Sequence, residues 1–231
     1  MDKPALILAA KSGDVQEVKN LLGKKVDVNE TNRSGATALI TASEKNHFEI
    51  VKLLVEAGAD TEMETKMGGT ALNKAAENGN IEMMQYLLDK GTAIGDLALI
   101  VAARSGNVES VEFLIEKGAN VDAQQRWGHT ALMLAAKNGH HEVVKLLIAS
   151  GADVKLRDKN GDTAMMIATE NEHDDVALLL KRAGAIAEVK PPKEKKPQVV
   201  EEDDDDDELE DTPDVDDLVS EDDGPDEVEL D

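Results

Sequence analysis

Residues 128–136 read Gly-His-Thr-Ala-Leu-Met-Leu-Ala-Ala, and variants of this phrase decide the fold because they return along the chain. The Ala-Leu part, Ala-Met in the last copy, begins at Ala5, Ala38, Ala71, Ala98, Ala131 and Ala164. Successive copies are separated by 33, 33, 27, 33 and 33 residues, so there are six units and the fourth lacks six residues. A fixed period of this length is typical of repeat proteins, in which similar units stack side by side.

Each unit has the same internal order. A short helix of small and apolar residues is followed by a polar turn, and a second helix places apolar residues at helical spacing, as Ile50, Val51 and Leu54 do. The second helix ends at a Gly-Ala pair such as Gly118-Ala119, and a polar stretch that suits a hairpin leads to the next unit. One helix pair has too little core to stand alone, so the units must stack.

These units resemble the ankyrin repeat over residues 4–185. The family's Gly-x-Thr-Pro-Leu-His corresponds to Gly-x-Thr-Ala-Leu at Gly35 and Gly128, and to the same phrase with Met165 for Leu at Gly161. The Thr positions also suit the hydroxyl that caps a helix N-terminus; they are Thr37, Thr70, Thr130 and Thr163. The family's His is replaced throughout, so its hydrogen bond to Thr does not carry over. The resemblance implies an all-α solenoid of helix-turn-helix units with β-hairpin fingers.

The spacing also predicts the domain organisation. We place a repeat array at residues 1–185, a Pro- and Lys-rich linker at 186–200 and an acidic tail at 201–231. The repeats span about residues 1–30, 31–63, 64–93, 94–122, 123–155 and 156–185. Eleven residues separate Gly58 from Thr70, but only five separate Gly91 from Leu97. We therefore expect the fourth finger to be absent and a notch to lie between the fingers of repeats three and five.

Most of the net charge of −24 belongs to the tail, because residues 201–231 hold 20 acidic residues and no basic one. Such a run repels itself and favours disorder. Three interpretations of the tail stay open. It solubilises the protein without a docking site, it docks on its own array, or it captures basic proteins as a polyanion.

The resemblance to ankyrin repeats implies that partners bind the concave face, which the finger tips and the inner-helix ends form. The matching positions here carry eight basic residues and four acidic ones, the latter being Glu44, Glu77, Asp162 and Glu170. This face leans basic, although residues 1–185 as a whole have a net charge of −6. The candidate partner-binding residues are Arg33, Lys45, Lys66, Met67, Arg104, Arg126, Trp127, His129, Lys137 and Lys159.

Trp127 is the only Trp in the chain and should stand at a finger tip beside the notch. Two interpretations stay open for it. It anchors a partner, since Trp is enriched among the residues that dominate interface energetics. Alternatively, its indole covers apolar atoms that the missing finger leaves exposed.

Several classes of chemistry are disfavoured by the sequence. The chain has no Cys, which excludes disulfides, thiolate metal sites and cysteine nucleophiles. The sequence His141-Glu142 is followed by Lys145 where a zincin helix needs its second His. No phosphate loop or nucleophile elbow is present. We therefore predict a non-enzymatic protein with no catalytic residues, no cofactor and no metal.

The sequence thus predicts a module that binds a protein partner through its concave face, with gating by the acidic tail as one hypothesis. The alternative is a polyanionic chaperone or buffer that holds basic proteins through the tail. Direct nucleic-acid binding is disfavoured by the net negative field. The sequence shows no secretory signal and no apolar run that could span a bilayer. We expect a cytoplasmic protein without a membrane partner, or a nuclear one if its source is eukaryotic.

Overall fold

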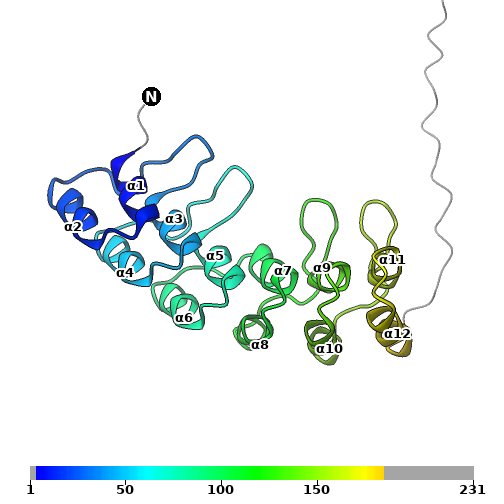
Figure 1. Cartoon of the computed structure of the whole chain (residues 1–231). Coiled ribbons are helices and arrows are strands. Elements are labelled where there is room, and N and C mark those ends of the chain that lie inside the picture. Colours follow the sequence, from blue (N-terminus) through cyan, green and yellow to red (C-terminus); the bar gives the residue numbers. More distant parts are fainter. Residues whose placement is uncertain (1–3, 185–231) are drawn as a thin grey trace, which may run out of the picture. The chain divides into compact units, whose positions relative to one another are not determined.

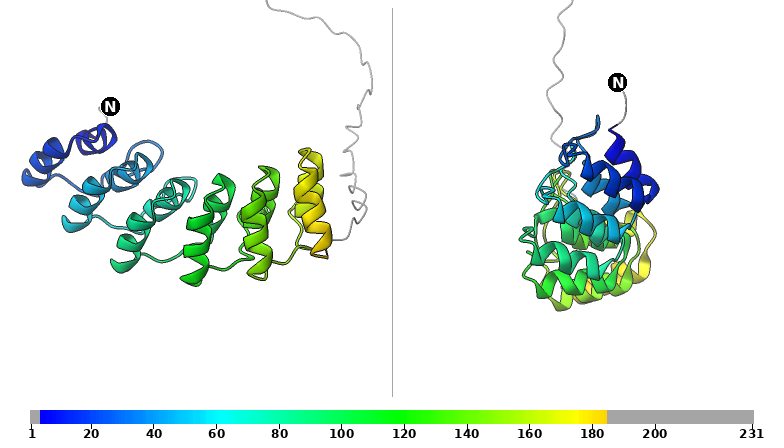
Figure 2. Two further views of the ribbon diagram at one scale, coloured as in Figure 1. Left: turned by 60° about the horizontal axis from the view of Figure 1, so that its bottom comes forward. Right: turned by 90° about the vertical axis from the view of Figure 1, so that its left-hand side faces the viewer.

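The computed structural model describes residues 4–184, so the expectations for the linker and the tail fall outside the described residues. Helices alternate between an inner and an outer row (Figures 1 and 2). The inner helices are α1 (Ala5–Ser12), α3 (Ala38–Glu44), α5 (Ala71–Glu77), α7 (Asp96–Ser105), α9 (Ala131–Lys137) and α11 (Ala164–Glu170). The outer helices are α2 (Val15–Gly23), α4 (Phe48–Glu56), α6 (Ile81–Asp89), α8 (Val108–Glu116), α10 (His141–Ala149) and α12 (Asp174–Arg182). The six-unit helical solenoid is confirmed.

The inner helices begin where the sequence predicts. Thr37 accepts a hydrogen bond from the backbone N–H of Ile40 at 3.1 Å, and the Thr residues before α5, α9 and α11 cap their helices in the same way. Repeat four differs, because Gly95 takes the capping position and provides no side-chain bond. Helix α7 starts instead with Asp96, whose negative charge suits a helix N-terminus.

The core is a continuous layer between the two rows of helices. The Leu of the repeated phrase is almost fully buried in the middle of the array, with exposed fractions of 1% at Leu39, Leu72 and Leu99 and 2% at Leu132. Small residues such as Ala75 and Ala102 are completely buried and let neighbouring inner helices approach closely. Each unit therefore buries its apolar face against the next unit.

Polar side chains join successive repeats where the inner helices end. The Asn107 side-chain N–H donates to the Glu77 carbonyl at 2.6 Å, and the Asn138 side-chain N–H donates to the Arg104 carbonyl at 2.7 Å. Asn78 makes the equivalent contact with α3. These bonds satisfy carbonyl groups that a helix C-terminus leaves without an intrahelical partner.

The expected hairpin fingers are present as tight loops, with tips at residues 32–36, 65–69, 125–129 and 158–162. In the third of these tips, the Gln125 N–H donates to the His129 carbonyl at 3.0 Å and the Gly128 N–H donates to the Gln125 carbonyl at 2.7 Å. Residues 4–184 contain no regular β-strand, only the isolated bridge between Arg157 and Thr163.

Adjacent fingers are bonded to each other through their backbones, which divides them into two pairs. The Lys66 N–H donates to the Ser34 carbonyl at 2.9 Å, and the Lys159 N–H donates to the Trp127 carbonyl at 3.1 Å. The close approach requires Gly at position 128, where φ is +81° and a Cβ atom would lie 2.9 Å from the Lys159 nitrogen.

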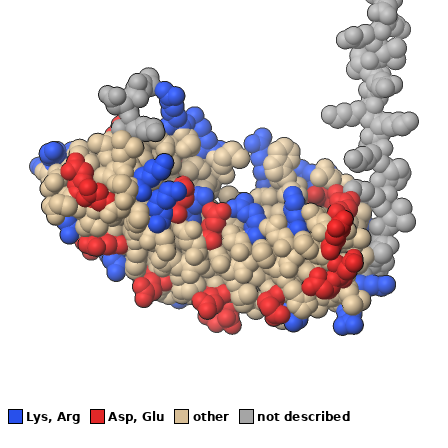
Figure 3. Space-filling model, viewed as in Figure 1, with Lys and Arg blue, Asp and Glu red and all other residues tan. Residues whose placement is uncertain are grey.

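The fourth finger is absent, as the spacing predicts. The chain passes from α6 to α7 through residues 90–95, with no loop at the level of the other finger tips (Figure 1). A Cβ atom on Gly68 would meet the Leu97 side chain at 3.3 Å, whereas one on Gly128 would meet the backbone of the following finger. The space-filling view shows the resulting gap between the two finger pairs, which we call the notch (Figure 3).

We predict that Gly128→Ala destabilises the array more than Gly151→Ala. Both positions have a left-handed backbone, with φ of +81° and +89°, so each substitution costs about 1 kcal/mol or more in the free energy of unfolding. Only Gly128→Ala adds a clash, since a Cβ on Gly151 would have no neighbour within 4 Å. Urea denaturation of both variants measures the difference. Equal losses would show that the finger pairs do not constrain the stack.

Candidate functional site

Each finger tip carries a basic residue followed by a variable one. The four pairs are Arg33-Ser34, Lys66-Met67, Arg126-Trp127 and Lys159-Asn160. All four basic side chains, which we call the finger cations, are exposed, and none has an ion pair among residues 4–184. Basic side chains gather along the finger side of the array in Figure 3, so this side offers positive charge to a partner.

Large apolar side chains stand at the finger tips only where the notch begins. Met67 is 89% exposed on one wall and Trp127 is 61% exposed on the other. The matching positions on the outer fingers are the polar Ser34 and Asn160. The Arg126 guanidinium lies 5.6 Å from the Trp127 ring centroid, a distance that suits a cation–π contact. The walls of the notch therefore combine apolar and positive groups.

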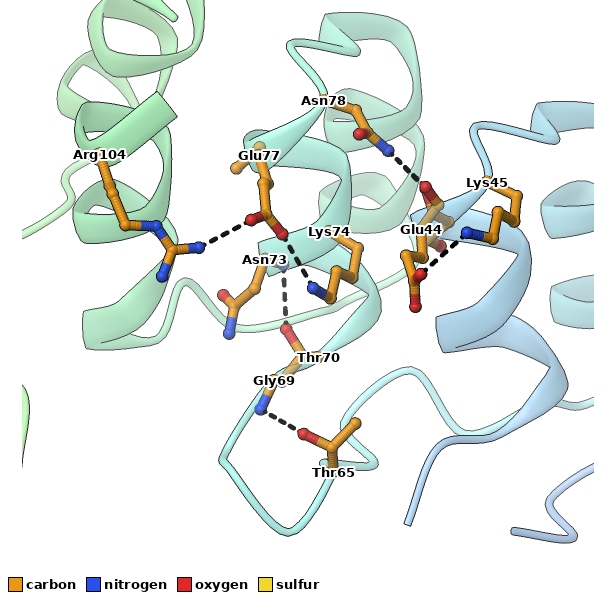
Figure 4. Close-up of polar contacts among 12 residues, drawn as sticks. Glu44, Lys45, Thr65, Gly69, Thr70, Asn73, Lys74, Glu77, Asn78 and Arg104 are labelled. Atoms are coloured by element: carbon orange, nitrogen blue, oxygen red, sulfur yellow. Dashed lines mark hydrogen bonds and ion pairs between the residues drawn. The ribbon is translucent and has the colours of Figure 1, made fainter. Parts of the chain in front are cut away.

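Five charged side chains at the ends of α3, α5 and α7, which we call the floor of the site, are paired with one another (Figure 4). The Glu77 carboxylate accepts from Lys74 Nζ at 2.8 Å and from an Arg104 guanidinium nitrogen at 2.7 Å, which links α5 to α7. Partial burial by itself raises the pKa of Glu77, but the hydrogen bonds and charges of Lys74 and Arg104 outweigh it and hold that pKa below its usual value. Lys45 is paired in turn with Glu44 at 3.1 Å.

The structure separates the predicted site residues into two groups. Six lie on the finger tips at or beside the row of finger cations, namely Arg33, Lys66, Met67, Arg126, Trp127 and Lys159. Lys45, Arg104 and Lys137 are exposed at the ends of inner helices, where the first two are already in ion pairs. The expectation that Asp162 lies on the concave surface is wrong. Its finger folds back on itself and leaves the residue only 6% exposed.

His129 is held between the last two fingers and is half-buried. Its Nε2 lies 3.3 Å from an Asp158 carboxylate oxygen, and its Nδ1 lies 3.1 Å from the Gln125 side-chain nitrogen. Asp158 also accepts hydrogen bonds from the backbone N–H groups of Asn160 and Asp162 at 2.8 and 2.9 Å. These contacts position the fifth and sixth fingers.

Sequence reasoning missed two features of this face. One is Lys74, which occupies the floor beside Glu77 where other repeats have an aliphatic residue or Thr. The other is a groove of about 810 Å³ over α1, between that helix, the finger of repeat two and α3. Its lining includes Pro4, Ile7, Leu8, Lys11, Arg33 and Glu44. The sequence contains a signal for this groove, because no Gly-x-Thr phrase precedes Ala5. Repeat one, like repeat four, therefore has no finger to fill this space.

Two absences within residues 4–184 concern metal ions and membranes. This part of the chain holds no group of three or more His, Asp or Glu side chains arranged to bind a metal ion. None of its helices has the length and apolar character needed to cross a bilayer.

Comparison with known proteins identifies the architecture. A family model described as "Ankyrin repeats (3 copies)" matches residues 6–98, 62–125 and 99–190. A chain of the solved complex between the predatory endopeptidase Bd0816 of Bdellovibrio bacteriovorus and the immunity protein Bd3460 has 31% sequence identity and a TM-score of 0.69. The match covers 79% of this chain and 99% of that one. No curated protein matches the sequence.

We predict that the Glu77 ion pairs stabilise the array in a pH-dependent way. A carboxyl group whose pKa in the folded state is lower than its ordinary value of 4.5 stabilises the fold at pH values above 4.5. This contribution is lost as the pH falls through the folded-state pKa. Glu77→Gln should therefore lower the free energy of unfolding at pH 7 by up to about 1 kcal/mol, after allowance for solvent screening. Urea denaturation between pH 7 and pH 3 measures this effect.

Glu112→Gln is the matched control, because Glu112 is exposed on α8 and has no ion pair among residues 4–184. It should change the free energy of unfolding little at any pH in this range. A Glu77→Gln effect that persists undiminished at pH 3 would contradict an ionic origin.

Proposed function

Because the chain belongs to the ankyrin-repeat family, we propose that it is a non-enzymatic module that binds a protein partner through the finger cations and the notch. The observation that carries this proposal is the exposure of Met67 and Trp127 on the two walls of the notch. Exposed apolar side chains beside unpaired cations are typical of a binding surface. Trp and Arg are also the residue types most enriched among those that dominate interface energetics.

The rigidity of the array favours binding over chemistry. The finger pairs are fixed by backbone hydrogen bonds and by buried Asp158, so little ordering of the backbone is required when a partner binds. The floor charges of Glu77, Lys74 and Arg104 are engaged with one another. They shape the surface and leave the finger cations to attract an acidic partner.

The solved neighbour supports a protein as the partner, since its structure is a complex between an endopeptidase and an immunity protein. One form of the proposal follows from that likeness. In this form, the protein partner of the chain is an enzyme, because the neighbour's complex pairs an immunity protein with an endopeptidase.

The acidic tail, residues 201–231, gates this site in our proposal. A tether of this kind supplies a segment with 20 acidic residues at an effective concentration on the order of millimolar. Its attraction to the finger cations acts over about 8 Å at physiological salt, so gating weakens as salt increases. The alternative function is a polyanionic chaperone or buffer for basic proteins, in which the tail itself binds the partner.

Affinity capture with the full chain, a truncation to residues 1–190, Trp127→Ala and the outer-finger control Asn160→Ala tests these functions together. We expect Trp127→Ala to weaken partner binding by about thirtyfold, corresponding to about 2 kcal/mol, and Asn160→Ala to leave it unchanged. The truncation should bind equally or more tightly. Loss of binding on truncation would support the polyanionic alternative.

Thermal unfolding of the same variants separates the two interpretations of Trp127. An anchor changes affinity with little effect on the melting temperature. If Trp127→Ala lowers the melting temperature and leaves affinity unchanged, the indole shields the array and the anchor role is wrong.

A further inference from the structure

Repeats one and four resemble each other beyond the lack of a finger. Residues 5–13 and 98–106 differ at only two positions, where Leu8 stands for Val101 and Lys11 for Arg104. Both stretches end in Ser-Gly, which no other repeat has at this place. Each of the two repeats is followed by two repeats that carry fingers. The array therefore consists of two similar halves, and each half begins with a vacant finger position.

Each vacant position leaves an aliphatic side chain of the inner helix open to solvent. Leu8 on α1 is 45% exposed, and Val101 at the equivalent place on α7 is half-buried. The equivalent residues of repeats two, five and six are buried, with exposed fractions of 7% at Thr41, 8% at Leu134 and 7% at Ile167. A ligand in either vacant position can therefore make an apolar contact with the inner helix.

The vacant position of the first half is the groove over α1. Its volume of about 810 Å³ lies within the range of roughly 300–1,000 Å³ that is typical of ligand sites. Pro4, Ile7 and Leu8 of α1 form one side of it, and residues 30–34 and 36 of the finger of repeat two form the other. A finger is a loop of chain, so the space that it leaves can hold a short extended segment of another protein.

The free charges in the groove are mainly positive. Lys11 and the finger cation Arg33 line it, and neither has an ion pair among residues 4–184. Lys45 also lines it but is paired with Glu44 at 3.1 Å. Within the same residues, Glu30 is the one lining carboxylate without an ion pair. Two free cations against one free carboxylate favour a ligand with negative charge.

Lys11 distinguishes this groove from the equivalent part of the second half. There, the Arg104 guanidinium is held by the Glu77 carboxylate of repeat three at 2.7 Å. Lys11 can pair with a ligand carboxylate without first losing an ion pair of this kind. The groove over α1 therefore offers a free cation and the exposed side chain of Leu8 on the same helix, three residues apart.

We propose that the groove over α1 is a second binding position, which holds an extended segment of a protein partner with an aliphatic side chain between two carboxylates. The aliphatic side chain contacts Leu8, and the carboxylates pair with Lys11 and Arg33. This inference rests on the proposed function only in taking a protein as the partner. Because Arg33 is also a finger cation, the groove extends the proposed surface beyond the notch to the first repeat.

A synthetic peptide of this chemistry tests the position. The probe is the blocked pentapeptide Glu-Leu-Asp-Leu-Glu, titrated into the isotope-labelled full chain while backbone amide chemical shifts are recorded by NMR. We expect the largest shift changes at residues 7–11 and 31–36. Changes confined to the notch, at residues 66–67 and 126–127, would overturn the second position and leave the proposed function intact.

A matched pair of charge variants tests the role of Lys11. Lys11→Gln should weaken peptide binding by about fivefold, the upper end for an exposed ion pair. Lys24→Gln is the control, because Lys24 is exposed in the same repeat, outside the groove lining, and has no ion pair among residues 4–184. Equal effects of the two variants would show general attraction to positive charge and would overturn the site.

The apolar contact has its own matched pair. Leu8→Ala should weaken peptide binding by about fivefold through lost apolar burial, whereas Leu178→Ala should leave it unchanged, since Leu178 is 49% exposed on α12 at the other end of the array. The peptide Glu-Ser-Asp-Ser-Glu should bind more weakly than the leucine peptide. Thermal unfolding checks that both variants stay folded. Unchanged affinity of Leu8→Ala would overturn the aliphatic part of the ligand, and Lys11→Gln tests the site even if Leu8→Ala unfolds.

Trp127→Ala separates this inference from the proposed function. The substitution should leave peptide binding in the groove unchanged, although it weakens partner capture if Trp127 is the anchor. Loss of peptide binding in this variant would place the peptide in the notch and overturn the second position.

Discussion

Every part of this structure depends on the requirement that an inner helix buries its apolar face against the inner helices on either side. Leu39, Leu72, Leu99 and Leu132 are almost fully buried only because neighbouring repeats cover them. The fully buried Ala residues beside them set a close spacing that is repeated along the array. Since this layer contains the helices and not the fingers, a finger can be lost without breaking the stack.

Repeats one and four show the consequence. Both lack a finger, and in both cases the space that a finger would occupy is open to solvent, as the groove over α1 and as the notch. In repeat four, Leu97 packs beneath Gly68 and Gly95 replaces the capping Thr. The deletion removes surface structure while the buried layer is preserved, so the notch arises at little cost to the core.

The sequence predicted the features that depend on local periodicity. The helices, the Thr caps and the absent fourth finger follow from spacing and from residue types such as Thr130 and Gly128, and the structure confirms them. It could not predict contacts between residues about one repeat apart. The Glu77–Arg104 ion pair and the contact of His129 with Asp158 depend on how one repeat sits against the next. The burial of Asp162 depends on how its own finger folds back on itself.

The same inter-repeat contacts explain why the notch differs from the rest of the finger row. Between bonded fingers, the backbone groups at Ser34 and Lys66 satisfy each other, so those edges offer nothing to a ligand. At the notch, the Met67 carbonyl and the Arg126 N–H have no hydrogen-bond partner among residues 4–184, and both residues are exposed, so water can satisfy these groups. In the proposed function, a partner segment that enters the notch can hydrogen-bond to these groups and contact Met67 or Trp127. The register of the finger row then sets where a partner can bond, and the finger cations supply the attraction.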